Sequence, residues 1–177
     1  MKEKKYLMYN GVLSYNDTAE ALAKINNVVL GPKKRIRLLK NREEYYTDIL
    51  TDKSIYDPLT LKGLEYRLTD STGKEYMKAY PHYAPEDDPS INGWPLNRLP
   101  RIDTLEIDMN RHYVMTMLNA SNYSLCREDG KEVMRIIHRG LIGGWHIEEC
   151  AGFSLEIICG LYEFCRYLEQ ENEFAVV

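Results

Sequence analysis

Residues 66–78 read YRLTDSTGKEYMK and residues 123–135 read YSLCREDGKEVMR, so one pattern occurs twice at an offset of 57 positions. Tyrosine, leucine, glycine, lysine, glutamate and methionine recur in register. Shared spacing of this kind indicates one supersecondary unit used twice. Period-two alternation places Tyr66 and Leu68, like Tyr123 and Leu125, on one strand face. The repeated glycine suits the positive-φ position of a hairpin turn with a bulge. Each copy therefore predicts a β-hairpin that buries its repeated apolar residues.

Further strands are predicted on both sides of the repeat. Asn10-Gly11 permits the two positive φ values of a type I′ turn and predicts a hairpin over residues 5–16. The segment 17–20 resembles a capping box and predicts a short helix over the apolar residues that follow it. The remaining segments are a strand at 33–39, a segment at 44–50 that fits either strand or helix, a hairpin of 104–108 with 112–118, and a glycine-rich bend at 140–144 that leads into 145–149.

The segment 153–170 differs in kind and predicts a helix. Ser154 is the expected N-cap, and Glu156 in the first turn suits the positive end of the helix dipole. The segment is apolar around most of its circumference, so it must be surrounded by other elements. Glu163 and Arg166 are spaced to pair with each other or with groups on the surrounding strands. The segment is too short and too charged to cross a bilayer.

Many short strands and one enclosed helix predict a mainly β fold. We expect an antiparallel β-barrel of short hairpins that encloses the hydrophobic C-terminal helix, since closure removes exposed sheet edges. Residues 1–177 form one domain in this interpretation. The sequence leaves open whether residues 1–58 complete the barrel or form a separate lobe. The proline-rich stretch 81–100 is expected to be an excursion from it.

Composition narrows the functional classes. The net charge of −4 argues against a general nucleic-acid binder. The N-terminus is charged and no apolar stretch follows it, so we expect neither a secretory signal nor a transmembrane span. The four cysteines contain no C-x-x-C pair and are expected to be reduced thiols in a cytoplasmic protein.

The duplicated Tyr-x-Leu-x4-Gly-Lys-Glu-x-Met hairpin followed by the hydrophobic helix resembles the tubby C-terminal-like group, with the LURP-one-related and bacterial tubby-like members as the closer match. The resemblance covers about residues 63–174 and rests on layout and hydrophobic pattern. It implies an antiparallel barrel around a central helix and a non-enzymatic binding or scaffolding role. Eukaryotic tubby proteins bind phosphoinositides through basic residues on the barrel wall, but no motif here allows those positions to be carried over.

A basic run within this acidic chain is the first candidate binding site. Residues 33–42 contain six cations. Alternation along a strand would gather positive charge on one face, which suits an anionic lipid headgroup, another phosphorylated ligand or an anionic membrane surface. The protein would then be cytoplasmic and peripheral at the membrane. The alternative is a solvated strand whose charges discourage edge pairing. The cations are Lys33, Lys34, Arg35, Arg37, Lys40 and Arg42.

Two other functional classes remain open. A protein-interaction module would use the 81–100 excursion with Trp94 as its anchor, since tryptophan is enriched among hot-spot residues. A small-molecule enzyme is the third alternative, but the sequence contains no nucleophile elbow or phosphate-binding loop. His146 and Cys150 would stand about 13 Å apart on a regular strand, too far to share a metal ion. We therefore expect no catalytic residues, no metal and no cofactor.

Overall fold

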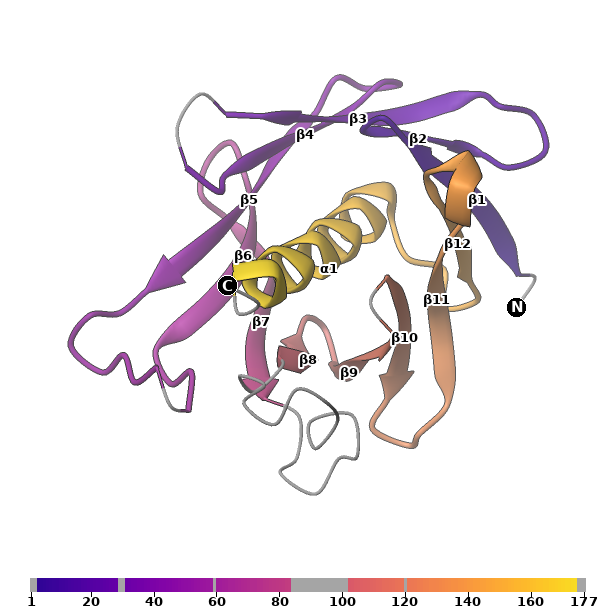
Figure 1. Ribbon diagram of the computed structural model, residues 1–177. Helices are drawn as coiled ribbons and strands as arrows, with labels where there is room; N and C mark the ends of the chain where they lie inside the picture. Colours follow the sequence, from indigo (N-terminus) through magenta and orange to yellow (C-terminus); the bar gives the residue numbers. More distant parts are fainter. Residues whose placement is uncertain (1–2, 29–30, 59, 84–101, 120, 175–177) are drawn as a thin grey trace.

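The computed structural model describes residues 3–28, 31–58, 60–83, 102–119 and 121–174. Its strands form a closed antiparallel barrel in which each pairs with the next along the chain and the last pairs with the first. A long α-helix runs through the ring of strands (Figure 1). The elements are β1 (Lys4–Tyr9), β2 (Val12–Tyr15), β3 (Ala21–Asn27), β4 (Lys34–Leu38), β5 (Glu44–Thr51), β6 (Leu64–Asp70), β7 (Glu75–Tyr83), β8 (Ile102–Asp108), β9 (His112–Asn119), β10 (Asn122–Arg127), β11 (Glu132–His138), the 3₁₀ turn η1 (Gly140–Ile142), β12 (Trp145–Glu149) and α1 (Leu155–Phe174).

The sequence repeat is a structural repeat. Its copies are the hairpins β6–β7 and β10–β11, and both ladders shift register directly after the repeated leucine, at Leu68 and at Leu125. Gly73 and Gly130 both have positive φ in the turns. The repeated tyrosine, leucine and methionine of each copy are buried. The prediction of a duplicated, bulged hairpin is confirmed.

The interior of the barrel is occupied by α1, as its apolar circumference predicts. Gly160 lets the helix approach the first repeat closely, since a Cβ at this position would lie 2.8 Å from Met77 Cε and 3.0 Å from Leu68 Cδ2. The second repeat contacts a different part of α1, where the Tyr123 hydroxyl donates to the carbonyl of Cys165 at 3.2 Å. Tyr66, the equivalent of Tyr123 in the first copy, also contacts the helix, since its ring packs against Phe164 and Tyr167.

The boundaries of α1 differ in part from the expectation. Ser154 does precede the helix, and its carbonyl accepts the Ile158 N–H at 3.1 Å, but its hydroxyl donates to Glu156. The helix continues to Phe174, beyond residue 170. Of the two alternatives expected for Arg166, the ion pair with Glu163 is not formed: Arg166 pairs with Glu169 one turn further on and lies over the Trp145 ring of β12.

The predicted helix after residues 17–20 is also wrong. Ala19 has a φ of 55°, so these residues form a left-handed turn that leads into strand β3. Ala23 and Ile25 are buried while Lys24 between them is exposed, which is the alternation of a strand. Pairing with β2 and β4 on either side decides the outcome. The ambiguous segment 44–50 is likewise strand, as β5.

Residues 1–58 do not form a separate lobe, because β1–β5 are five of the strands that close the barrel. Pro81, expected at the start of the excursion, instead belongs to β7 and pairs with Leu105, and residues 84–100 of the expected excursion lie outside the described residues. Hairpin connections alternate between the two barrel ends. We call the end where α1 begins the proximal end and the end where it finishes the distal end. The connections β1–β2, β3–β4 and β11–β12 lie at the distal end, where the Tyr167 hydroxyl donates to the Pro32 carbonyl at 2.9 Å.

Candidate functional site

The six cations of the basic run are distributed over the full height of the barrel. Arg35 and Arg37 are exposed on the outer wall, whereas Lys34 alternates with them and is half-buried beside the inward-facing Ile36. Lys33 precedes β4 at the distal end. Lys40 and Arg42 lie in the β4–β5 turn at the proximal end. The expected alternation is present, but it places only two of the six cations side by side on the outer face.

The structure adds a cation that the sequence interpretation missed. Strand β3 pairs with β4 in a register that places Lys24 opposite Arg37 and Asn26 opposite Arg35. Directly opposite residues have Cβ atoms about 5 Å apart, and alternate residues along a strand are about 7 Å apart. Lys24, Arg35 and Arg37 therefore form a compact cationic group, which we call the basic wall.

Little negative charge faces the basic wall. Glu44 on β5 lies opposite Arg37, and one of its carboxylate oxygens is 4.0 Å from Arg35 Nη1. Glu44 also accepts a hydrogen bond from the Tyr46 hydroxyl at 3.1 Å. Lys24 and Arg37 make no ion pair with the described part of the chain. Like charges directly opposite each other destabilise a sheet, so the Lys24–Arg37 pair needs an explanation other than stability.

Lys33 extends positive charge from the basic wall toward the distal end. Its ammonium lies 5.1 Å from the centre of the Tyr46 ring, within the range of a cation–π contact. Burial and the neighbouring Glu44 raise the pKa of the Tyr46 hydroxyl, so the ring stays neutral. Lys34 points away from this surface and donates to Asn27 Oδ1 at 2.8 Å. It therefore does not belong to the basic wall.

A buried acid lies on α1, and its charge is influenced by Lys34. Glu163 is 5% exposed and has no hydrogen-bond or ion-pair partner among the described residues. Burial raises the pKa of its carboxyl group to about 7, although the positive charges of Lys34 and Arg166 act in the opposite direction. Arg166 lies over the Trp145 ring, with its guanidinium carbon 5.0 Å from the ring centre. Glu163 is thus a buried polar group, whereas Lys34 and Arg166 are only half-buried.

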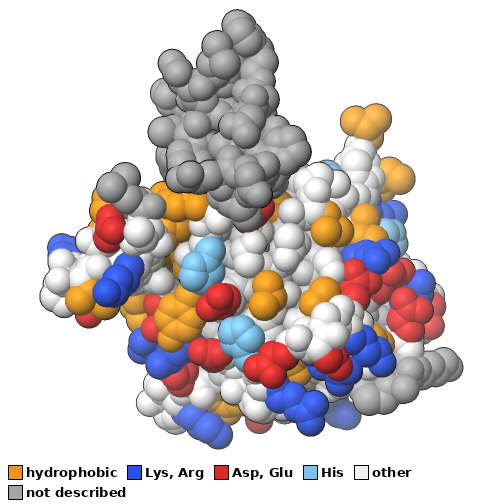
Figure 2. Space-filling model, turned by 90° about the horizontal axis from the view of Figure 1, so that it is seen from below, with side chains coloured by type: hydrophobic (Ala, Val, Ile, Leu, Met, Phe, Trp, Pro, Cys, Tyr) orange, Lys and Arg blue, Asp and Glu red, His pale blue; other side chains and the backbone are white. Residues whose placement is uncertain are grey.

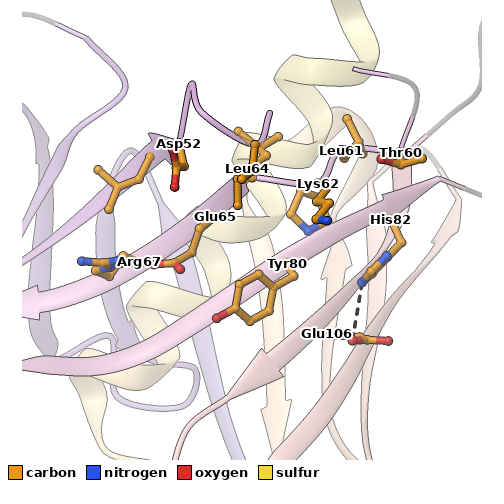
Figure 3. A pocket seen from close by; sticks show the side chains of 14 residues that line it. Asp52, Thr60, Leu61, Lys62, Leu64, Glu65, Arg67, Tyr80, His82 and Glu106 are labelled. Atoms are coloured by element: carbon orange, nitrogen blue, oxygen red, sulfur yellow. Dashed lines mark hydrogen bonds and ion pairs between the residues drawn. The ribbon is translucent and has the colours of Figure 1, made fainter. Parts of the chain in front are cut away.

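A groove on the outer wall lies between the β5–β6 connection and strands β6–β8, with a volume of about 550 Å³ (Figure 3). His82 Nε2 is 3.6 Å from a carboxylate oxygen of Glu106, and Arg67 donates to Glu65 at 2.6 Å. The groove thus contains both acidic and basic side chains, and these pair with each other. The other labelled residues are Asp52, Thr60, Leu61, Lys62, Leu64 and Tyr80. Such a lining does not favour one class of charged ligand.

One other face of the barrel, shown in Figure 2, differs from the basic wall. In the face that Figure 2 shows, acidic and basic side chains are interspersed with apolar and neutral ones.

Among the described residues, no three His, Cys, Asp or Glu side chains are grouped as metal ligands would be. Trp94, the expected anchor for a protein partner, lies outside the described residues.

Comparisons with known proteins add no assignment: no family model, curated protein or solved structure matches this chain. No helix in the described part of the chain combines the length and apolarity that a membrane crossing needs.

Proposed function

We propose that this chain is a non-enzymatic binding domain whose basic wall attaches to an anionic membrane surface. The observation that carries the proposal is the convergence of Lys24, Arg35 and Arg37 from two strands, of which, among the described residues, only Arg35 makes an ion pair, with Glu44. Protection of an exposed strand edge does not explain these charges. Strand β4 is paired on both sides, and the barrel has no free edge. Phosphate and carboxylate groups of lipid headgroups complement these cations.

We propose further that the chain is related to the tubby-like group. The closed twelve-strand barrel around a C-terminal helix supports this relation, because it is the architecture that the resemblance implies. The duplicated hairpin, with the same bulge in both copies, supports it as well. Under this proposal the protein is cytoplasmic and peripheral at the membrane.

The strength of attachment follows from the number of cations. A cation near an anionic membrane surface contributes about 1 kcal/mol, so three contribute about 3 kcal/mol. A millimolar Kd corresponds to about 4 kcal/mol. Attachment through the basic wall alone is therefore weak and reversible, and salt weakens it because the side chains are exposed.

Vesicle sedimentation tests the proposal. Wild-type protein is expected to pellet with mixed phosphatidylcholine–phosphatidylserine vesicles at low salt, less at physiological salt, and not with phosphatidylcholine alone. The variant K24S/R35S/R37S should lose binding on the order of 100-fold. Its matched control is K74S/K131S/R135S, which removes the same charge from exposed positions around the β6–β7 and β10–β11 turns. Equal binding by the two variants would refute the proposal.

A further inference from the structure

The turn between β11 and β12 exposes two large aliphatic side chains. Leu141 is fully exposed and Ile142 is 70% exposed, more than any other large apolar residue in the described ranges. Both belong to the 3₁₀ turn η1, none of whose residues is buried. Adjacent large aliphatics in water are unfavourable and indicate contact with something apolar.

This exposure does not result from a loose loop. The Gly143 N–H donates to the Gly140 carbonyl at 3.1 Å, and the Arg139 N–H donates to the Gly144 carbonyl at 3.0 Å. Gly144 has a φ of 81°, and a Cβ there would lie 2.7 Å from the Met8 carbonyl oxygen. Only glycine fits this close approach to β1. The backbone thus holds the two aliphatic side chains outward in a defined conformation.

The groups behind the tip are those that suit a membrane interface. Tyr9 is 48% exposed and lies against Gly143 and Gly144. Trp145 is half-buried at the base of the turn. Arg139 supplies a cation, and residues 139–144 contain no acid. Aliphatic residues outermost, with aromatic and cationic residues behind them, match the polarity gradient from acyl chains to headgroups.

The tip and the basic wall lie on neighbouring parts of the barrel. The β11–β12 and β3–β4 connections are both at the distal end, so Lys33 and the tip lie at the same end. Strand order places β12, β1, β2, β3 and β4 side by side around the wall. Two strands, β1 and β2, therefore separate the strand that follows the tip from the first strand of the basic wall.

We infer that Leu141 and Ile142 insert into the boundary between headgroups and acyl chains of an anionic bilayer. This inference rests on the proposed function, since the cations attract the surface and the tip adds apolar contact. Arg139 beside the inserted residues and Lys33 at the same barrel end complement the negative headgroups. A single exposed apolar tip is too small to bind a neutral bilayer by itself. The two features together overcome the weakness of the basic wall alone.

Fluorescence quenching by brominated phosphatidylcholine within anionic vesicles measures the insertion. The variant L141W places a reporter at the tip, and L39W places one at an exposed leucine of the proximal β4–β5 turn. We expect added quenching over wild type for L141W and none for L39W. A second pair measures affinity: L141S/I142S should bind at least about tenfold more weakly, whereas L39S should bind like wild type.

The outcomes separate the two proposals. Absent or salt-independent binding of wild-type protein would overturn the proposed function, and the inference with it. Salt-sensitive binding of wild type, together with an unquenched L141W and full binding by L141S/I142S, would overturn the inference alone. All substituted positions are exposed, and equal thermal melting of the variants shows that each is folded.

Discussion

The buried carboxyl of Glu163 makes folding stability depend on pH, and E163Q isolates this effect. Glu163 is enclosed between α1 and the strands, with Lys34 on β4 and Arg166 on α1 as the charged groups that act on it. Burial disfavours its ionised form more than these two cations favour it, which raises the pKa to about 7. Glutamine has nearly the same shape but cannot ionise.

The sign and size of the effect follow from linkage. Below about pH 4.5 the group is protonated in both states, so it imposes no penalty. Between about 4.5 and 7 the unfolded chain ionises while the folded one does not, so the free energy of unfolding falls as pH rises. Above about pH 7 the loss of folding stability is complete. The rise in pKa from 4.5 to about 7, at about 1.36 kcal/mol per pKa unit, corresponds to about 3 kcal/mol.

Urea unfolding followed by far-ultraviolet circular dichroism at several pH values measures this pH dependence of the free energy of unfolding. The stability of E163Q relative to wild type should increase by about 3 kcal/mol between about pH 4.5 and pH 8. Any pH-independent cost of burying the amide cancels in this comparison. The control E20Q, at an exposed position in the β2–β3 turn, should show no such increase. Parallel pH profiles for E163Q and wild type would refute the reasoning.

Three further predictions concern the barrel. Y167F should cost about 1–2 kcal/mol in urea unfolding, because it leaves the buried Thr47 hydroxyl without its partner at 2.8 Å, whereas T47V/Y167F should recover part of this loss. G144A should lower the melting temperature, since the added Cβ meets the Met8 carbonyl; an unchanged melting curve would show that β1 can move away. Alkylation at neutral pH, read by mass spectrometry, should modify the half-buried thiols quickly and the thiols on α1 only in urea, because burial raises the pKa of both α1 thiols. Rapid modification of all four thiols would contradict the enclosed helix. The half-buried thiols are Cys126 and Cys150, and those on α1 are Cys159 and Cys165.

The fold was predictable because two independent signals agreed. The repeated hairpin identified strands and their buried face, and the all-round apolar helix required an enclosure. The segment 17–25 was not predictable in the same way, because Ala21, Leu22 and Ile25 fit a helical periodicity while Ala21, Ala23 and Ile25 fit that of a strand. Pairing with β2 and β4, which is a long-range effect, made it a strand.

That same segment explains why the candidate site was only partly predictable. The basic run was visible as a cluster in sequence, but a strand separates its members by face and by height. Lys24 joins Arg37 only through the β3–β4 register. Interpreting 21–27 as a strand would have revealed this pairing, because the hairpin brings residues 24 and 37 together. Linear clustering thus grouped residues that the strand places on different faces and at different heights of the barrel.

The basic wall is tested most directly by comparing two double variants on anionic vesicles. K24S/R37S removes the facing pair of the basic wall, and K40S/R42S removes two cations of the same basic run at the proximal turn. We predict that K24S/R37S loses about 2 kcal/mol of binding, or roughly thirtyfold in partitioning, with no loss of folding stability. K40S/R42S should bind like wild type. Equal losses, or a larger loss for K40S/R42S, would contradict a binding surface built from β3 and β4.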